Sequence, residues 1–493
     1  MSHTPLTFRF GPLERRGLLG PLDGPQLAVL AAAAVALVIL LDLSPRPGTA
    51  LAGVSLIALI TGAAFAPAGG RRAIQWLPTA AGFLGRGARG RRRFRSRAPL
   101  AGHRATPSVS GDPTPVSPVL GGITVEALAH PSGTLGLIRD RSDRRISTVL
   151  ACEVPALTLL DPADQERRLT QWGVLLSTLA SGPVRRLQWL ERTGPADGDA
   201  LARWLQRERD PELGVHGSAV MESYLELISA SAPVIQSHEL LLTLQLDLRR
   251  VRGGPAGVRI AAIEQTERVA GVLAGGEVTV LGALGPRQVE RALHTGFDPY
   301  LECQPGHGTP GVPNSRTETG RGAPPTPMAL DEHWDHLRCD GALHATFWIA
   351  GWPRVEVPAL FLSGLLHRAG TARAVAVTFE PVAAARSTRE VEAAVTRDRA
   401  DRALRQRFGQ SETARHRQSQ EAALRREAEL AAGHGEVRFS GFITVSGRDE
   451  GELRRGCAET IQQAAAARLE LRRLYGQQAE AFTFTLPLAR GLR

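Results

Sequence analysis

The densest group of side chains that could do chemistry is the run Glu332-His333-Trp334-Asp335-His336-Leu337-Arg338-Cys339-Asp340, with His344 shortly after it. Imidazole, thiolate and carboxylate groups are common zinc ligands, so His333, His336 and Cys339 are the candidate metal ligands. Their spacing matches neither H-E-x-x-H nor paired C-x-x-C. On a helix the two histidines would share a face, and on a strand they would point to opposite faces. The alternative interpretation is a Trp-anchored segment with exposed polar neighbours.

Several other chemistries lack the residues they need. All 59 basic residues are arginine, so the chain has no lysine for a P-loop, a Schiff base or a lysine general base. No G-x-S-x-G elbow occurs. Residues 85–90 match G-x-G-x-x-G by letters, but no strand is expected before them, and we treat the match as chance. We therefore expect no catalytic residue and no cofactor.

The positive charge is concentrated near the start of the chain. Of the formal net charge of +10, residues 1–104 carry +11, from 14 Arg and 3 acidic residues, and the remainder carries −1. A nucleic-acid-binding domain usually has a basic face of its own, so direct nucleic-acid binding is not expected. A basic cluster expected at a membrane surface consists of Arg86, Arg89, Arg91, Arg92, Arg93, Arg95 and Arg97.

Two apolar stretches, Gln26–Leu43 and Thr49–Ala66, flank a turn that contains two prolines and a glycine. Each has about 18 residues and would extend about 27 Å as a helix, so the pattern predicts a transmembrane helical hairpin. Arginines lie on both outer sides of the hairpin, which predicts a two-pass protein of the inner membrane with both termini in the cytoplasm. The lipid bilayer is then a partner. Four widely separated cysteines are typical of a reducing compartment.

The rest of the chain is expected to fold as mixed α/β (α+β) domains, because strand-like alternation and helical periodicity follow one another. The last of them, which contains the strand-like run 437–446, is expected to be ferredoxin-like, with β-α-β order. The expected organisation is an N-terminal cytoplasmic segment 1–24, the hairpin 25–67, a basic and Pro/Ser-rich linker 68–118, a domain 119–303, a Gly/Pro-rich loop 304–330 and a domain 331–493 with a charged helical stretch 387–432.

A series of short motifs occurs in an order typical of one family. They are Trp172-Gly173, Asp298-Pro299-Tyr300, His333-Trp334-Asp335-His336, Asp340-Gly341-Ala342, Tyr475-Gly476-Gln477-Gln478-Ala479 and Leu486-Pro487-Leu488. With the apolar hairpin in front, the chain resembles an actinobacterial family of integral membrane proteins encoded in conjugation-like, type IV secretion-like loci.

The resemblance implies two joined pieces. The hairpin is similar to a PrgI-type membrane subunit, and the remainder looks like the N-terminal, non-ATPase half of the conjugative secretion ATPase. It implies a non-catalytic inner-membrane scaffold or adaptor that associates with itself and docks a separate secretion ATPase. Two alternatives remain open: a membrane subunit of a type VII-like secretion system, and a membrane-anchored metal-dependent enzyme that uses His333, His336 and Cys339.

Overall fold

The computed structural model describes a large part of the chain. The described residues are 7–8, 10, 24–43, 47–68, 71–95, 119–130, 133–141, 144–153, 160–195, 219–231, 236–276, 278–300, 327–367, 370–383, 386–389, 393, 428 and 435–492. Arg97 and most of the expected charged helical stretch 387–432 lie outside them. The chain divides into a main unit (residues 1–11, 93–474 and 478–493) and a small unit (residues 12–92 and 475–477).

The main unit is built on an antiparallel sheet of 13 strands. Its first half contains β5 (Ile123–His130), β6 (Gly133–Asp140), β7 (Arg145–Glu153), α4 (Pro162–Leu179), β8 (Val184–Pro195), α6 (Ala219–Ser231), β9 (Gln236–Asp247), α7 (Gly254–Ala274), β10 (Thr279–Ala283) and α8 (Pro286–Phe297). Its second half contains β11 (Ala329–Glu332), β12 (Leu337–Cys339), β13 (Ala342–Gly351), α9 (Ser363–His367), β15 (Arg373–Val382), β16 (Glu436–Gly447), α12 (Glu450–Ala466), β17 (Glu470–Arg473), α13 (Gln478–Phe482) and the 3-10 turn η4 (Thr483–Thr485). The strand β4 (Arg93–Arg95) pairs with β11. A separate pair joins β1 (Thr7–Phe8) to β14 (Val357–Pro358).

The two halves have the same topology. In the first half the strand order is β8-β9-β7-β10, and in the second it is β15-β16-β13-β17. Each is a β-α-β-β-α-β unit in which a third strand separates the two strands of each β-α-β connection, as in ferredoxin-like folds. Two paired strands precede each of these arrangements, β5 and β6 in the first half and β11 and β12 in the second. The second strand of each pair also pairs with the first strand of the arrangement, β6 with β7 and β12 with β13. The sequence predicts one ferredoxin-like unit, in the last block from residue 437, whereas the structure has two, and the second of them already begins at Ala342.

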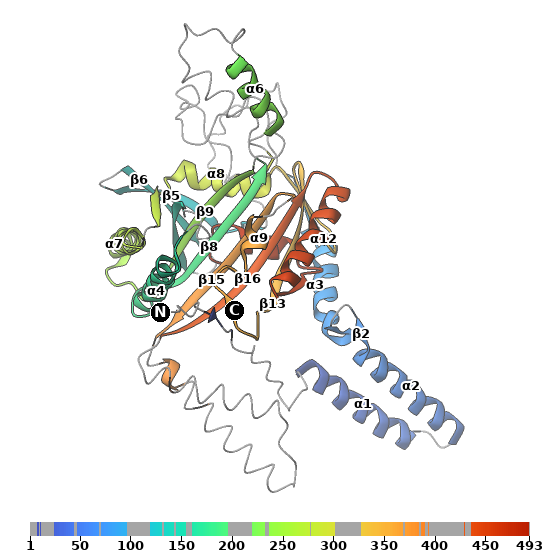
Figure 1. Cartoon of the computed structure of the whole chain (residues 1–493). Coiled ribbons are helices and arrows are strands. Elements are labelled where there is room, and N and C mark those ends of the chain that lie inside the picture. The colour runs from blue at the N-terminus through green and yellow to red at the C-terminus, as the bar shows by residue number, and fades with distance from the viewer. Residues whose placement is uncertain are drawn as a thin grey trace, which may run out of the picture. The chain divides into compact units, whose positions relative to one another are not determined.

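We call the β-α-β-β-α-β arrangement of the first half repeat 1 and that of the second half repeat 2. The two repeats are joined where β8 pairs with β15. These strands run antiparallel from Leu187 opposite Phe379 to Thr193 opposite Arg373, with Leu190 opposite Ala376 at the centre. In both repeats the longest connection, 196–235 or 383–435, follows the second strand. Figure 1 shows the long strands β9, β8, β15 and β16 side by side in one continuous sheet.

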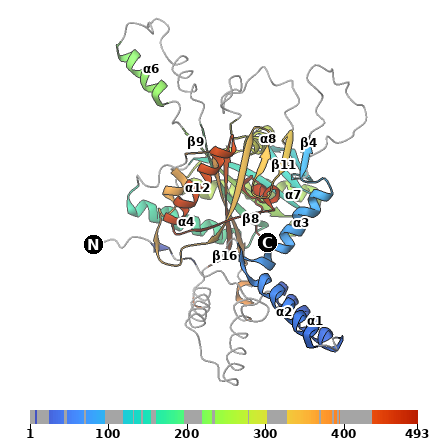
Figure 2. The same ribbon diagram turned by 90° about the vertical axis from the view of Figure 1, so that its right-hand side faces the viewer.

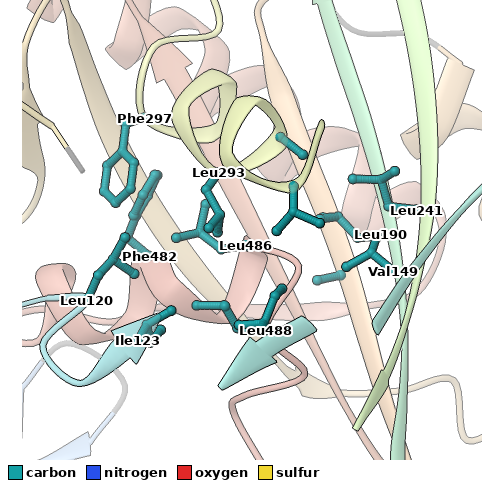
Figure 3. Packing of buried hydrophobic residues seen from close by; sticks show 14 of the residues in the cluster. Leu120, Ile123, Val149, Leu190, Leu241, Leu293, Phe297, Phe482, Leu486 and Leu488 are labelled. Atoms are coloured by element: carbon teal, nitrogen blue, oxygen red, sulfur yellow. The ribbon is translucent and has the colours of Figure 1, made fainter. Parts of the chain in front are cut away.

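Alternation along the strands sorts side chains onto two faces. On β9, Leu242, Leu244 and Leu246 pack against α4 and α7. On β16, Ile443 and Val445 pack against α9 and α12 on the same face of the sheet. The opposite face is covered by α8 and by residues that follow β17, whose buried side chains include Phe297, Phe482, Leu486 and Leu488 (Figure 3).

The small unit contains α1 (Gly24–Leu43), α2 (Pro47–Phe65), β2 (Pro67–Ala68), β3 (Arg71–Arg72), the 3-10 turn η1 (Ala73–Trp76) and α3 (Leu77–Ala88). The helices α1 and α2 lie side by side (Figures 1 and 2). Their approach is close at Gly53, where an added Cβ atom would lie 2.4 Å from a Leu40 methyl group. Arg72 donates to the Gln26 side-chain oxygen at 2.9 Å, which ties β3 to the start of α1.

The prediction of a transmembrane hairpin is wrong. In the part of the chain that the structure describes, no helix combines the length and the apolarity needed to cross a bilayer. The apolar run of α1 lies between Gln26 and Asp42, and that of α2 is interrupted by Ser55 and Thr61. The predicted two-pass inner-membrane location, with both termini in the cytoplasm, is contradicted by the same finding.

The seam between the repeats predicts a single unfolding event for the main unit. Replacing Leu190, whose side chain is fully buried at the centre of the seam, with alanine should lower the free energy of unfolding by about 2–5 kcal/mol. Leu190→Ala should also keep one cooperative transition in urea, followed by circular dichroism. Leu281→Ala is the control, because Leu281 is 65% exposed. This substitution should change the free energy of unfolding by less than about 0.5 kcal/mol. Two separate transitions would contradict the continuous seam.

Candidate functional site

The predicted metal ligands lie on the β-hairpin that β11 and β12 form. β11 and β12 are joined by a tight turn in which the His333 backbone N–H donates to the His336 carbonyl at 2.9 Å. The two imidazole rings are stacked, with centroids 4.4 Å apart and an angle of 9° between their planes. Cys339 is fully buried on the core side of β12, and burial raises the pKa of its thiol well above the usual range. The structure therefore brings the histidines together but not the cysteine.

Carboxylates around the two histidines form ion pairs. Asp331 lies 3.0 Å from Arg93, and Asp335 lies 2.8 Å from His336 and 3.6 Å from Arg473. Partial burial raises the pKa of Asp335, but the His336 hydrogen bond and the Arg473 charge outweigh it, so the net pKa is lowered. No group of three His, Cys, Asp or Glu residues within the described ranges is arranged to hold a metal ion.

The predicted basic cluster is divided between the two units. In the small unit, Arg86 donates to the Gly476 carbonyl, and Arg92 lies over the Phe83 ring, 4.5 Å from its centroid. Arg89 and Arg91 are exposed at the end of α3. In the main unit, Arg93 and Arg95 lie on the short strand β4.

A group of polar side chains that the sequence analysis missed lies buried on the sheet face opposite the helices α4 and α12. Gln188, Thr243 and Gln245 are at most 3% exposed, although they sit among leucines on β8 and β9. Thr378 continues the group on β15. We call these four side chains the polar face. Buried polar groups need hydrogen-bond partners, so something must supply donors and acceptors to them.

The segment Gln478–Leu492 supplies most of those partners, and we call it the strap. Gln188 donates to the Phe484 carbonyl at 2.8 Å and accepts from the Ala489 N–H at 2.9 Å. Gln245 donates to the carbonyls of Leu488 and Ala489 at 3.1 and 3.3 Å. Gln188 thus binds the strap at Phe484 and at Ala489, and Gln245 binds the main chain at Leu488 and Ala489.

The strap is also held beyond Ala489. Thr378 donates to the Arg490 carbonyl at 3.2 Å. Arg186 donates to the Leu492 carbonyl and forms an ion pair with Glu380 at 2.8 Å. Burial lowers the pKa of Arg186, while the Glu380 carboxylate opposes that effect.

The beginning of the strap binds to repeat 2. The Gln478 side chain accepts from the Thr346 N–H at 2.9 Å and donates to the Leu474 carbonyl at 2.9 Å. The Ala479 N–H donates to Glu332 at 3.2 Å. The hydroxyl groups of Thr444 and Thr485 are 2.7 Å apart.

A buried histidine–serine pair lies on the same face of repeat 2. The two nitrogens of His344 lie 2.8 Å from the Ser446 hydroxyl and 2.9 Å from the Phe297 carbonyl. Because the carbonyl can only accept, Nε2 carries the proton and Nδ1 accepts from Ser446. Burial lowers the pKa of His344 to about 4, so its ring is neutral near pH 7. Both side chains are buried, at 0% and 6% exposure, and the histidine is oriented by a carbonyl instead of a carboxylate, so the pair fixes main chain and is unsuited to nucleophilic catalysis.

The motif Asp298-Pro299-Tyr300 lies next to this pair. The Tyr300 hydroxyl donates to the Ser446 carbonyl at 3.1 Å, and its backbone N–H donates to the Asp298 carboxylate at 3.1 Å. Burial raises the pKa of Tyr300 above its usual range. The segment after α8 is therefore anchored on β16.

The two repeats exchange their last segments. The segment after repeat 1, Phe297–Tyr300, docks on β13 and β16 of repeat 2. The strap, which follows repeat 2, docks on β8 and β9 of repeat 1. The two segments meet where the rings of Phe297 and Phe482 lie 5.0 Å apart (Figure 3).

A second buried polar group lies on the helix-covered face. Arg373 donates to Gln463 at 2.7 Å and to the Leu365 carbonyl, which joins β15 to α12 and α9. Burial lowers the pKa of Arg373 to about 10. Burial also raises the pKa of Glu191, and the charges of His367 and Arg373 oppose that rise.

No protein-family profile matches the chain, and no curated protein is significantly similar to it.

The two hydrogen bonds between Gln188 and the strap can be tested by removing the side-chain amide. Gln188→Met keeps the length of the side chain but leaves the Ala489 N–H and the Phe484 carbonyl buried without partners. We expect the free energy of unfolding in urea to fall by about 2–5 kcal/mol. Gln462→Met is the matched control on the exposed side of α12 and should change it by less than about 0.5 kcal/mol. Equal effects of the two substitutions would contradict this role of the two hydrogen bonds.

Burial of neutral His344 predicts a specific pH dependence. The folded-state pKa of about 4 lies below the ordinary value of 6.5, so in this window the unfolded chain binds the proton more readily. Stability from this group is complete above pH 6.5 and is lost as the pH falls toward 4, by roughly 3 kcal/mol. Urea unfolding at several pH values should show a smaller loss for His344→Gln than for the unsubstituted protein. An identical loss in both proteins would remove His344 as the cause.

Proposed function

We propose that this chain is a non-catalytic scaffold or adaptor protein of a type IV secretion-like, conjugation-like apparatus that docks a separate ATPase. The assignment to this apparatus rests on the family resemblance in the sequence. The assignment of a scaffold role rests on the structure of the motifs that carry the resemblance.

The observation that carries the proposal is that several of these motif residues are buried or hydrogen-bonded to main chain. Asp298, Tyr300 and Gln478 bind main chain inside the main unit. Leu486 and Leu488 are buried in the core that covers the polar face. Residues that mark the resemblance therefore maintain the fold of the main unit, and in a scaffold the fold is what holds the binding surfaces in place.

Exposed apolar side chains support a binding role. On α6, the residues Val220, Tyr224 and Leu227 recur at helical spacing and are 80%, 36% and 63% exposed. The helices α1 and α2 expose a further set of large apolar side chains: Leu30, Val35, Val38, Ile39, Leu51, Val54, Leu56, Leu59 and Ile60. Extended apolar surfaces of this kind are typical of interaction sites.

The experiment is a binding titration between the purified full-length chain and a purified ATPase with a Walker motif encoded next to its gene. We expect saturable 1:1 or higher-order binding, with a Kd in the micromolar range or below, typical of specific interfaces. A secretion ATPase from an unrelated locus is the matched control and should not bind.

Two results would overturn the proposal. One is the absence of saturable binding to the neighbouring ATPase under conditions in which the chain is folded. The other is a stoichiometric metal ion that is retained by the purified chain and lost in His333→Ala, because that result would favour the metal-dependent enzyme.

A further inference from the structure

The sheet recognises the strap through the strap's main chain. Five carbonyls of the strap accept hydrogen bonds from side chains of the sheet, and they belong to Phe484, Leu488, Ala489, Arg490 and Leu492. One strap N–H, that of Ala489, donates to Gln188. Recognition by main chain depends on the path of the peptide and not on which molecule supplies it.

Apolar anchors set the position of the strap along the face. Phe482, Leu486 and Leu488 are at most 4% exposed and belong to one buried cluster with Leu190, Leu241 and Val149, in which Phe482 lies next to Phe297 (Figure 3). Each anchor fills a place in the core between the strands and α8. A second strap of the same sequence would fit the same places.

The face has hydrogen-bonding capacity beyond what the strap uses. In the described part of the chain, Thr243 Oγ1 and Gln245 Oε1 are buried and have no hydrogen-bond partner. Both belong to the polar face. A buried polar atom without a partner costs free energy, so the strap is bound with less than the full hydrogen bonding that the face offers.

Exchange of terminal segments is already built into the molecule. Repeat 1 places its last segment on repeat 2, and repeat 2 places the strap on repeat 1. Two units of the same topology therefore complete each other within one chain. Two copies of the chain can use the same geometry, because domain exchange reproduces the contacts of the closed form.

The strap is joined to β17 through a short loop with a glycine hinge. Gly476 has a φ of +67°, a conformation that glycine adopts readily and other residues adopt at a cost. Tyr475 and Gly476 are held in the small unit, where the ring of Tyr475 lies 5.8 Å from that of Trp76 and Arg86 binds the Gly476 carbonyl. A positive φ at Gly476 is therefore part of the closed path that leads into the strap.

We propose that the strap exchanges between two copies of this chain, so that the polar face of each copy binds residues 478–492 of the other. The partner is a second copy, and the surface is the polar face with its neighbouring apolar core. The equilibrium between closed monomer and exchanged dimer is set by concentration and by the hinge, because both forms make the same strap contacts. This inference does not depend on the proposed secretion role.

The hinge provides the test. Gly476→Pro fixes φ near −65° and is incompatible with the closed path, whereas Gly476→Asn tolerates a positive φ and is the matched control. Light scattering coupled to size exclusion should show a rise of at least about tenfold in the dimerisation constant for Gly476→Pro. Gly476→Asn should match the unsubstituted chain.

The position of the strap in the dimer is tested with a photoreactive residue in place of Leu488. Light and isotopically heavy full-length chains are mixed, and cross-linked peptides are identified by mass spectrometry. Strap exchange predicts cross-links from the strap of a light chain to β9 of a heavy chain. A Gly476→Pro dimer with only within-chain cross-links would overturn the proposal, and so would a folded Gly476→Pro monomer.

If Gly476→Pro does not fold, the chain with native Gly476 is partly denatured and refolded as a concentrated mixture of light and heavy forms. Mixed cross-links in its dimer fraction would support exchange. A refolded mixture with within-chain cross-links alone would overturn it.

Discussion

Burial of polar side chains on one face of the central sheet is the constraint on which the structure depends. Gln188 and Gln245 project from strands whose other face is covered by leucines, and they lie where a purely apolar sheet would carry another aliphatic layer. Burying an amide without hydrogen-bond partners costs free energy, and the main chain that lies across these two glutamines supplies most of their partners. The strap meets this need for partners with main-chain groups in η4 and in the irregular segment after it, whereas the carbonyls inside a regular α-helix are already engaged. The choice of glutamine in two strands thus determines the conformation of residues far away in the sequence.

The same principle operates twice because the fold is duplicated. In repeat 2, His344 and Ser446 occupy the face that Gln188 and Gln245 occupy in repeat 1, and they hold the segment after α8. The chemistry differs, with an imidazole and a hydroxyl in one repeat and amides in the other, but the task is the same. Each repeat lacks a complete cover of its own and obtains it from the other repeat. This reciprocity explains how two ferredoxin-like units form one core across their shared seam.

Part of this architecture could be predicted from the sequence. Strand-like alternation located several strands, and the order of elements indicated mixed α and β structure; the ferredoxin-like prediction from residue 437 covered only the second half of repeat 2. The duplication was missed because the two repeats share topology without an obvious sequence period, and only pairing between distant strands reveals it. The hairpin prediction is wrong, because no helix in the described part of the chain is both long enough and apolar enough to cross a membrane. The polar face was missed because the Thr243 and Gln245 pattern is also what a strand with one solvated face would show. The sequence indicated His333, His336 and Cys339 as candidate metal ligands. The structure shows that the two imidazole rings stack while the Cys339 side chain is buried in the core.

The seam between β8 and β15 has a consequence for the long connections that follow them. Because the two strands are antiparallel, the connection 196–235 leaves beside Thr193 and Arg373, and the connection 383–435 leaves beyond Leu187 and Phe379, at the other end of the pair. The two exits are separated by about 30 Å, the length of a strand of this size. The seam therefore sets the distance between the points at which the two connections leave the sheet.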